Sequence, residues 1–498
     1  MRGLRDAALV ALAYLLANRF PAPSGWGYAE AAGAFLLPAA AFAALGRGRR
    51  AGWIFLGFLA GTAGGFHWVP EVMRSKGGLP WAGALGAGFL FWGYEAAGLL
   101  AVTLLGRLAL RRGPAAGALA AAAGIVLWQA FAFHIYDFSF GASLGGVPWM
   151  ARGAAFLGTH GLAALLWGLG AWSGFQAAAG APWRRRLTAP CLLLALLAGL
   201  GGAWRLLPRG PEHRLDVVMV QPGYPPGVRL PLMEADMWRR TDAALRAASL
   251  PRPERATLVL WPESAVLGRD DRLASDRLRE EARRRGVAWL YGTEGGPFNL
   301  VRGEAAGRPA FVQAKVLPMP FGERMPGPAP VRAWLDAQLG FYSAEPGDLG
   351  PGSSFAFPAP GGLLKAHPLI CSEALVETRV ARGLALAGGD LLTNHTNDGW
   401  FDRSPATDLH AAQVRLRAVE TGLPLLRATL TGKSGLFRAD GSWELWGGPM
   451  TEAAYAFPLA WRPVATPARA PWLVPALLAL LGAALAAALV LPARGPAR

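Results

Sequence analysis

The sequence predicts a membrane domain of eight helical spans joined to a separate domain of the α/β or α+β class. Of the 498 residues, 53% are hydrophobic and 16% are charged. That composition is too apolar for an ordinary soluble enzyme and too mixed for a chain that lies in a membrane throughout. Eight apolar segments have lengths near that of a membrane span. Between the last two, short strand-type runs alternate with helical patterns.

Most of the apolar segments approach the roughly 20 residues that a helix needs to cross a bilayer. They cover residues 7–20, 28–45, 51–72, 81–105, 115–133, 154–177, 190–206 and 472–491. The first segment is short and follows Arg2 and Arg5, as the apolar region of a signal peptide would. Because no small-residue cleavage pattern precedes Arg19 and further spans follow at once, we interpret it as a retained span.

The arginines between the spans predict the orientation, because cytoplasmic loops of membrane proteins carry an excess of Lys and Arg. If the amino terminus is cytoplasmic, that face collects Arg2, Arg5, Arg47, Arg49, Arg50, Arg107, Arg111, Arg112, Arg184, Arg185, Arg186, Arg494 and Arg498. The short loops of the opposite face hold Arg19, Arg74, Lys76 and Arg152, with Arg205 and Arg209 just beyond span seven. The net charge of +16 therefore fits a membrane topology. It does not indicate a nucleic-acid partner, since no aromatic platform lies among the arginines.

This topology divides the chain into three parts. Residues 1–207 form the first seven spans, residues 208–467 form one domain outside the cytoplasm, and residues 468–498 form the eighth span and a cytoplasmic tail. In the middle part, strand-type runs occupy residues 214–222, 256–264, 286–294, 309–318, 362–371 and 389–398. Helical patterns occupy residues 232–248, 269–286 and 406–422, and Pro- and Gly-rich loops that could act as lids occupy residues 318–332 and 343–362.

Three side chains stand where strand-type runs end, namely Glu263, Lys315 and Cys371. A rigid sheet commonly holds catalytic groups at such positions. A thiol becomes a good nucleophile only when a base or a cation promotes its ionisation. A carboxylate can take its proton, and an ammonium can stabilise the thiolate and then an oxyanion. The other cysteine, Cys191, lies in an apolar run and is expected to behave as a small hydrophobic side chain.

Each of the three residues also has an ordinary structural interpretation. A glutamate after a strand is commonly solvated or caps a helix, and a cysteine at an apolar strand end is commonly a core residue. The chain strongly prefers arginine, so Lys315 is unusual, although codon bias explains such a preference equally well. Their shared position at strand ends in one domain is what favours a catalytic interpretation.

Longer motifs around these residues resemble the nitrilase superfamily of Glu-Lys-Cys enzymes. They are "WPES", "KVLPMPFGERMP", "ICSEALVE" and "TNDGWF" followed by "VRLRAVETGLPLLRAT". Together with the eight spans, they resemble its membrane-embedded branch, the bacterial apolipoprotein N-acyltransferases, over nearly the whole chain. The resemblance implies an αββα sandwich in which Glu263 is the general base, Lys315 stabilises the oxyanion and Cys371 is the nucleophile. Glu323 and Glu373 match positions that support this triad.

Three positions depart from the family pattern. Ser372 follows the cysteine where tyrosine is usual, Gly223 stands where an amide side chain is usual, and Asp402 in "WFD" replaces the commoner glycine. None of them belongs to the triad. They bear on the shape of the pocket and on the preferred acyl donor.

The resemblance implies transfer of an acyl chain from a phospholipid to the α-amine of a diacylglyceryl-apolipoprotein, without a cofactor. The reaction would proceed by ping-pong kinetics through a Cys371 thioester, at the outer face of the bacterial plasma (inner) membrane. Two alternatives remain open at this point. A membrane-tethered amide hydrolase would use the same triad but admit water to the thioester, and a transporter or scaffold would use the spans without catalysis.

Other polar residues are candidates outside the triad. Glu95 lies in the fourth apolar segment, where a carboxyl group indicates either function or a pair between helices. His67, His134 and Asp137 are expected near outer membrane ends. The spacing of Asn394, His395, Asn397, Asp398 and His410 matches no common metal-ligand pattern, so we expect no metal and interpret the Asn and Asp residues as turn-forming.

Overall fold

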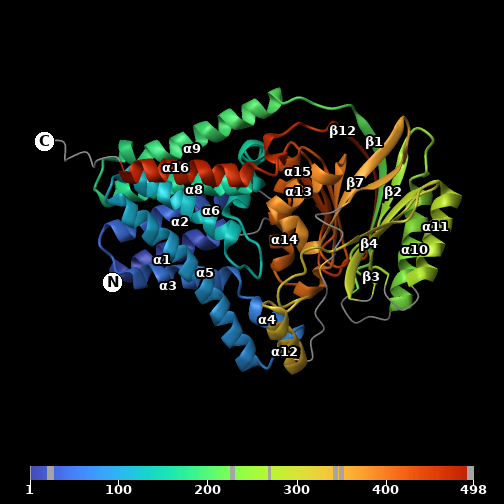
Figure 1. The fold of residues 1–498 in the computed structure, drawn as a ribbon, viewed down its shortest axis with the longest axis horizontal. Coiled ribbons are helices and arrows are strands. Elements are labelled where there is room, and N and C mark those ends of the chain that lie inside the picture. The colour runs from blue at the N-terminus through green and yellow to red at the C-terminus, as the bar shows by residue number, and fades with distance from the viewer. Residues whose placement is uncertain are drawn as a thin grey trace. The chain divides into compact units, whose positions relative to one another are not determined.

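The computed structural model describes residues 2–18, 27–224, 230–266, 271–295, 297–339, 346 and 353–490. The chain forms two compact units (Figure 1). One comprises Met1–His134, Phe138–Leu207 and Trp472–Arg498, and the other comprises Ile135–Asp137 and Pro208–Pro471. Arg19, Arg494, Arg498 and most of the predicted loop over 343–352 lie outside the described residues.

The first unit is helical. Its helices are α1 (Arg2–Ala17), α2 (Gly27–Gly46), α3 (Ala51–Gly65), α4 (Val69–Ser75), α5 (Trp81–Leu110), α6 (Pro114–Phe131), α7 (Pro148–Ala151), α8 (Ala154–Ala178), α9 (Trp183–Ala203) and α16 (Leu473–Val490), with 3₁₀ turns η1 (Phe140–Gly146) and η2 (Trp204–Leu206). Seven of the eight predicted apolar segments each overlap one long helix in this unit, whereas the segment over 51–72 covers α3 and the start of α4. Helix α2 packs on α1 and α8, and α6 packs on α5 and α8. Small residues permit this approach, since a Cβ on Gly33 would lie 2.4 Å from the Ala17 backbone nitrogen.

Five helical stretches among the described residues are long and apolar enough to cross a membrane. They are Gly27–Gly46, Trp81–Leu110, Pro114–Phe131, Ala154–Ala178 and Trp183–Leu206. Helices α1, α3 and α16 coincide with the other three predicted spans but fall short of that length or apolar character over the residues described. These helices indicate a multi-pass membrane protein. The count of eight spans and their orientation remain predictions.

The second unit contains two six-stranded sheets. The first sheet has the order β12-β1-β2-β3-β4-β5 and the second has the order β11-β10-β9-β8-β7-β6. The first consists of β1 (His213–Gln221), β2 (Ala256–Leu260), β3 (Ala288–Gly295), β4 (Phe298–Glu304), β5 (Phe311–Ala314) and β12 (Ala453–Trp461). The second consists of β6 (Phe355–Ala359), β7 (Gly362–Ile370), β8 (Leu391–Thr396), β9 (Leu425–Thr429), β10 (Ser434–Phe437) and β11 (Trp443–Trp446).

The central strands of both sheets are parallel, which brings their carboxyl ends to a common edge within each sheet. Strands β1, β2 and β3 run parallel, as do β7, β8 and β9. All five residues of β2 are buried, as are all six of β8. Burial on both faces explains why the sequence of β2 is a continuous apolar run rather than an alternating one.

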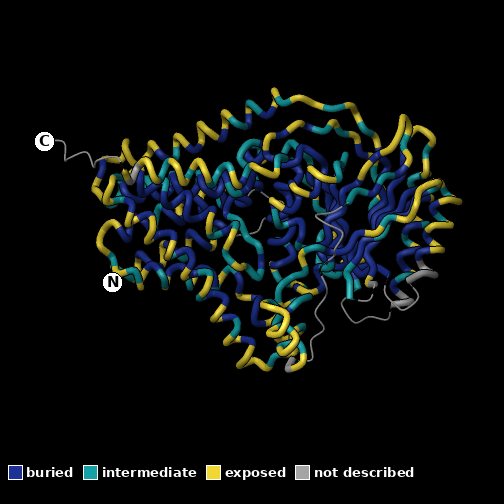
Figure 2. Tube along the Cα trace, viewed as in Figure 1, coloured by how far each residue is buried: buried dark blue, intermediate teal, exposed yellow. Residues whose placement is uncertain are grey.

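Helices cover the outer face of each sheet, giving the layer order α–β–β–α that the resemblance predicted. The covering helices are α10 (Leu230–Ala247) and α11 (Asp271–Arg285) on the first sheet, and α13 (Glu377–Ala387), α14 (Ala406–Val414) and α15 (Leu416–Thr421) on the second. Figure 1 shows the two groups on opposite sides of the strands, and Figure 2 shows the strands buried between them. One apolar core, which includes Leu258, Leu290, Ile370 and Leu426, fills the space between the sheets. The remaining elements are α12 (Ala329–Leu339), η3 (Cys371–Leu375), η4 (Asp398–Phe401) and η5 (Pro467–Arg469).

Candidate active site

The three strand-end residues follow strands of both sheets. Glu263 lies three residues beyond β2 and Lys315 directly follows β5, both in the first sheet, whereas Cys371 directly follows β7 in the second. All three are buried, with 3%, 2% and 8% of their surfaces exposed. Buried charged groups persist only when they are paired or hydrogen-bonded, so their partners define the site.

Lys315 lies between two carboxylates. Its Nζ atom is 3.4 Å from Oε1 of Glu263 and 2.7 Å from Oε2 of Glu323. The amide nitrogen of Asn299, on β4, donates to both carboxylates, at 2.6 Å to Glu263 and 2.9 Å to Glu323. Burial alone would lower the pKa of Lys315, but the charges of Glu323 and Glu263 outweigh it and raise the pKa above its ordinary value. Lys315 is therefore a permanent cation in this site.

The pKa values of the two carboxyl groups are shifted in opposite directions. Burial raises the pKa of Glu263 above its ordinary value, against the lowering effect of Lys315, and the charge of Glu323 raises it further. Burial also acts to raise the pKa of Glu323, but Lys315 and a hydrogen bond from the Met319 backbone N–H (2.7 Å) bring it below its ordinary value. Glu263 is thus the carboxylate better suited to accept a proton, while Glu323 stays charged and holds the lysine.

The Cys371 thiol interacts electrostatically with these charged groups and lies at the end of β8. Its backbone adopts a positive φ of 47°, which turns the chain from β7 into η3. Thr396, the last residue of β8, places its hydroxyl 3.2 Å from the sulfur, and the next backbone N–H, that of Asn397, donates to Oε2 of Glu263 at 2.7 Å. Consecutive residues of β8 and its following turn therefore link the thiol to the carboxylate.

The resting sulfur is protonated at neutral pH. Burial raises the pKa of Cys371 to about 12, and the charge of Glu263 adds to the effect, whereas Lys315 and the Thr396 hydroxyl act to lower it. A thiol with such a pKa needs a base during attack, because only the thiolate is a strong nucleophile. Glu263 is a base with a raised pKa in the same buried cluster.

Glu373 joins the segment that carries the lysine to the strand that carries the cysteine. It is fully buried, and its carboxylate accepts hydrogen bonds from the backbone N–H groups of Val316 (2.7 Å) and Ile370 (2.9 Å). Those two residues adjoin Lys315 and Cys371. The Arg379 guanidinium lies 3.6 Å away. Glu373 therefore fixes the backbone of two triad residues without belonging to the Glu263–Lys315 cluster.

The polar cluster after β7 corrects one sequence-based interpretation. Asn394 was interpreted as turn-forming, but it lies inside β8 with its neighbour His395, and both are fully buried. The Asn394 amide donates to the carbonyl oxygen of Cys371 (3.1 Å), and the imidazole of His395 donates to that of Trp261 (2.7 Å). Asn397 does form a turn, since its side chain accepts a hydrogen bond from Gly399 N–H. No group of three or more potential metal ligands occurs in the described part of the chain.

The remaining candidate residues lie elsewhere. Glu95, in α5, is paired with His134, whose Nδ1 atom is 3.0 Å away, so the paired alternative is the one observed. His67 bonds locally to the Gly64 carbonyl, and Asp137 is part of the second unit. Gly223 has a φ of 75°, and a Cβ there would lie 2.8 Å from the Thr451 carbonyl carbon. The close backbone explains why no amide side chain occupies this position.

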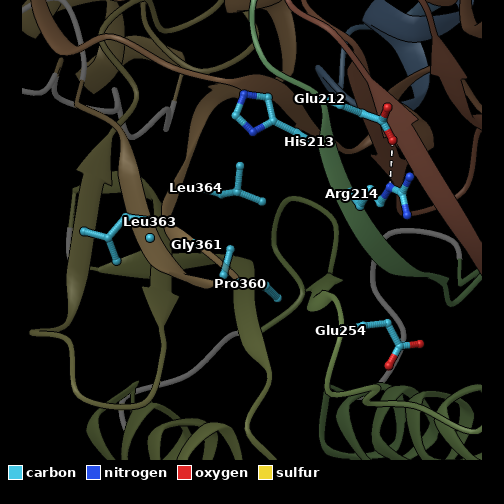
Figure 3. Close-up of a pocket in the computed structure, with 10 residues that line it drawn as sticks. Glu212, His213, Arg214, Glu254, Pro360, Gly361, Leu363 and Leu364 are labelled. Atoms are coloured by element: carbon cyan, nitrogen blue, oxygen red, sulfur yellow. Dashed lines mark hydrogen bonds and ion pairs between the residues drawn. The ribbon is translucent and has the colours of Figure 1, made fainter.

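A separate surface pocket lies at the opposite ends of the strands from the triad. It is formed where β1 begins and where β6 turns into β7, and it is lined by Glu212, His213, Arg214, Glu254, Ala359, Pro360, Gly361, Gly362, Leu363 and Leu364 (Figure 3). Glu212 forms an ion pair there with Arg214, whose Nε atom lies 2.7 Å from its Oε1 atom. None of the predicted site residues lines this pocket.

Known proteins resemble both the domain and the longer chain. Residues 305–451 match the carbon-nitrogen hydrolase family. The chain is 30% identical to an apolipoprotein N-acyltransferase of Allorhizobium ampelinum over 65% of its length and 63% of that protein. It is 31% identical to one of Rhizobium etli over 60% and 59%, and 28% identical to one of Geobacter metallireducens over 88% and 86%. The first two matches thus span about three fifths of each relative.

These similarities agree with the family resemblance, and residues 305–451 are similar to the carbon-nitrogen hydrolase family. The matched residues include Lys315, Glu323, Cys371 and Glu373, whereas Glu263 precedes them. Among solved structures, a glutamine-dependent NAD+ synthetase from Acinetobacter baumannii is similar with a TM-score of 0.33 at 15% identity, over 49% of this chain and 45% of that one. A likeness of that size carries no conclusion about function.

Proposed function

We propose that the protein transfers an acyl chain from a phospholipid to the α-amine of the N-terminal diacylglyceryl-cysteine of apolipoproteins, through a thioester on Cys371. The observation that carries this proposal is the buried pairing of Lys315 with Glu263 and Glu323, which Thr396 and Asn397 link to the Cys371 thiol. The names of the relatives support the substrates. The catalytic assignment is Glu263 as general base, Lys315 as oxyanion stabiliser and Cys371 as nucleophile, with Glu323 and Glu373 in support.

The proposed setting is the bacterial plasma (inner) membrane. Eight spans, formed by α1, α2, α3, α5, α6, α8, α9 and α16, would place both termini in the cytoplasm and residues 208–467 at the outer face. Residues 1–207 and 468–498 then form the membrane domain. Both substrates carry hydrocarbon tails, which is a physical reason for holding an amidase-type domain at a bilayer.

In the first half-reaction, the Glu263 carboxylate takes the proton of the Cys371 thiol as the sulfur attacks the ester carbonyl of a phospholipid. The Lys315 ammonium stabilises the resulting oxyanion. When this intermediate collapses, the ester C–O bond breaks, and the departing alkoxide takes the proton from Glu263. Lysophospholipid leaves, and the acyl chain remains on sulfur as a thioester.

In the second half-reaction, the neutral α-amine of the acceptor attacks the thioester carbonyl. Glu263 takes one proton from the attacking nitrogen, the C–S bond breaks, and the departing thiolate receives that proton. The products are an N-acylated lipoprotein and the starting thiol. Because the first product leaves before the second substrate reacts, the kinetics are ping-pong.

The match to carbon-nitrogen hydrolases favours one competing function, a membrane-tethered amide hydrolase. The purified full-length protein is mixed with phospholipid labelled in its acyl chain, with and without a diacylglyceryl lipopeptide. Transfer predicts labelled amide only when the lipopeptide is present, whereas a hydrolase releases labelled fatty acid in both mixtures. Cys371→Ala should abolish transfer, and Cys191→Ala, at an exposed position in α9, serves as the matched control.

A further inference from the structure

The hydroxyl of Thr396 has two competing acceptors. Its Oγ1 atom lies 3.2 Å from Sγ of Cys371 and 3.3 Å from Oδ1 of Asp398. A threonine hydroxyl carries a single proton and so donates to one acceptor at a time. Thr396 is fully buried, and a buried hydroxyl gains by keeping a hydrogen-bond acceptor. A change in the charge of either acceptor therefore shifts the balance between the two hydrogen bonds.

Asp398 is held as a carboxylate by the groups behind it. The Arg427 guanidinium lies 2.7 Å from Oδ2, and the imidazole of His410 lies 3.0 Å from Oδ1. Burial acts to raise the pKa of Asp398, but Arg427 and His410 bring it below its ordinary value. Asp398 thus stays anionic and accepts a hydrogen bond from the hydroxyl whenever the sulfur does not.

The same arginine also holds the backbone of the nucleophile. Arg427 donates to Oδ1 of Asn394 at 2.6 Å, and the Asn394 amide donates to the carbonyl oxygen of Cys371 at 3.1 Å. Arg427 therefore orients Asp398, which competes for the hydrogen bond of Thr396, and, through Asn394, it also orients the Cys371 carbonyl. Both arrangements help to position the Thr396 hydroxyl relative to the Cys371 sulfur.

We propose that Thr396 is a positioning residue whose hydroxyl donates to the Cys371 sulfur when it is a thiolate and returns to Asp398 when it is protonated or acylated. An anionic sulfur is a far better acceptor than a thiol or a thioester sulfur. The proton stays on the threonine oxygen throughout, so no bond to hydrogen breaks. The hydroxyl lowers the energy of the thiolate, which forms in the first half-reaction and departs in the second. The acylated state in this scheme rests on the proposed function.

Several titratable groups surround the sulfur and its neighbour Asp398, and they have to be kept constant in a test. Glu263, Lys315 and Glu323 act on the charge of the sulfur, and the buried Tyr136 phenol interacts with it electrostatically. His410 and Arg427 act on Asp398, the other acceptor of the Thr396 hydroxyl. Substitutions at Thr396 leave all of them in place. A change in thiol reactivity in these variants then reports the hydroxyl itself.

The test measures alkylation of Cys371 by iodoacetamide in the full-length protein, with Cys191→Ala present so that one cysteine remains. Thr396→Val removes the hydroxyl at nearly constant shape, and Thr396→Ser keeps it. Loss of a hydrogen bond to a charged group raises a pKa by about one unit. The thiolate fraction then falls about tenfold, of which higher intrinsic nucleophilicity recovers about threefold. We expect alkylation of Thr396→Val to be about threefold slower at each pH below the pKa, and Thr396→Ser to match the parent.

Thr396→Ala removes the same hydroxyl with a different shape and replaces the valine variant should that one fail to fold. Equal slowing in both supports a hydroxyl effect. Parent-like rates in the hydroxyl-free variants, or a serine variant as slow as they are, would overturn the proposal. Because alkylation needs neither phospholipid nor lipopeptide, its outcome is independent of whether the protein transfers acyl chains.

Discussion

Oε2 of Glu323 lies 2.7 Å from the ammonium of Lys315, which makes Glu323 the nearer of the lysine's two carboxylate partners. The nearer anion fixes the ammonium, and the farther one, Glu263, remains available to move a proton. Glu323→Gln should therefore leave the fold intact but slow lysophospholipid release by about 10²-fold, because a misplaced cation stabilises the oxyanion poorly. Glu280→Gln, in an exposed ion pair on α11, is the matched control and should change the rate less than twofold. A parent-like rate in Glu323→Gln would contradict this role.

The pH dependence of acylation should report Glu263. Burial raises the pKa of this carboxyl, and the charge of Glu323 raises it further. The base is active only when deprotonated, so the rate should fall as the pH drops through a pKa above the ordinary value for glutamate. In Glu323→Gln the neighbouring negative charge is lost, and the acid limb should move to lower pH. Initial rates of lysophospholipid release across the acidic range test this, and a limb that stays in place or rises would refute it.

Glu373 should matter for stability as well as for activity. Its carboxylate receives two backbone N–H groups in a fully buried position. In Glu373→Ala both donors lose their acceptor, which costs about 3 kcal/mol or more of unfolding free energy. Denaturant unfolding measures the loss, and acyl transfer should decline with it because the backbone on both sides of the site is released. Unchanged stability in Glu373→Ala would contradict this prediction, because the Val316 and Ile370 N–H groups would then have found other acceptors.

Buried imidazoles should make the second unit sensitive to mild acid. Burial lowers the pKa of His395 to about 4, and burial with nearby Arg379 and Arg469 lowers that of His367 to about 3. The unfolded chain binds protons at these rings below about pH 6.5, whereas the folded chain does not. Stability is therefore lost as the pH falls, by about 1.4 kcal/mol per pH unit for each ring.

His395→Gln separates one of these contributions. Glutamine keeps an N–H donor for the Trp261 carbonyl but does not titrate. Unfolding followed by fluorescence of the Trp238, Trp261 and Trp289 cluster should show a shallower slope below neutral pH, by about 1.4 kcal/mol per unit. Equal slopes in parent and variant would mean that this imidazole becomes protonated in the folded state.

Glu95 should prove to be a structural residue. Its carboxylate is paired with His134 at 3.0 Å, and the other ring nitrogen of His134 lies 3.0 Å from the Trp128 carbonyl. Glu95→Gln keeps a hydrogen-bond acceptor for the imidazole, so acyl transfer should stay within about twofold of the parent. Glu95→Leu removes the acceptor and should lower thermal stability. A large loss of activity in Glu95→Gln at unchanged stability would restore the functional alternative.

The sequence predicts what depends on local pattern and leaves out what depends on contacts between segments far apart in the chain. Apolar runs ending at Glu263, Lys315 and Cys371 are visible because β2 is buried throughout, while β5 and β7 become buried toward their carboxyl ends. Asn299 gave no such signal, because the strand-type runs predicted over 286–294 and 309–318 leave out β4, on which it lies. Its bonds to Glu263 and Glu323 join positions 36 and 24 residues apart, and no local periodicity records such a pairing.

Thr396 and His395 illustrate the same limit. The run that contains them was predicted as strand-type, but its polar residues suggested a turn because Asn and Asp commonly form turns. In the structure these polar side chains are buried, since Trp261 just after β2, Cys371 just after β7 and Arg427 in β9 provide hydrogen-bond partners. A buried polar strand is possible only when such distant partners exist, so the sequence of the strand alone could not identify it.

Mass spectrometry of the acylated protein tests the central claim most directly. The full-length protein is incubated with a phospholipid of defined acyl chain in the absence of acceptor. It is then digested under mildly acidic conditions, and the masses of its peptides are measured. We predict one acyl adduct, on the peptide that contains Cys371, which hydroxylamine and the acceptor lipopeptide both remove and which Cys371→Ala lacks. An adduct on any other residue, or turnover of phospholipid by Cys371→Ala at the parent rate, would contradict it.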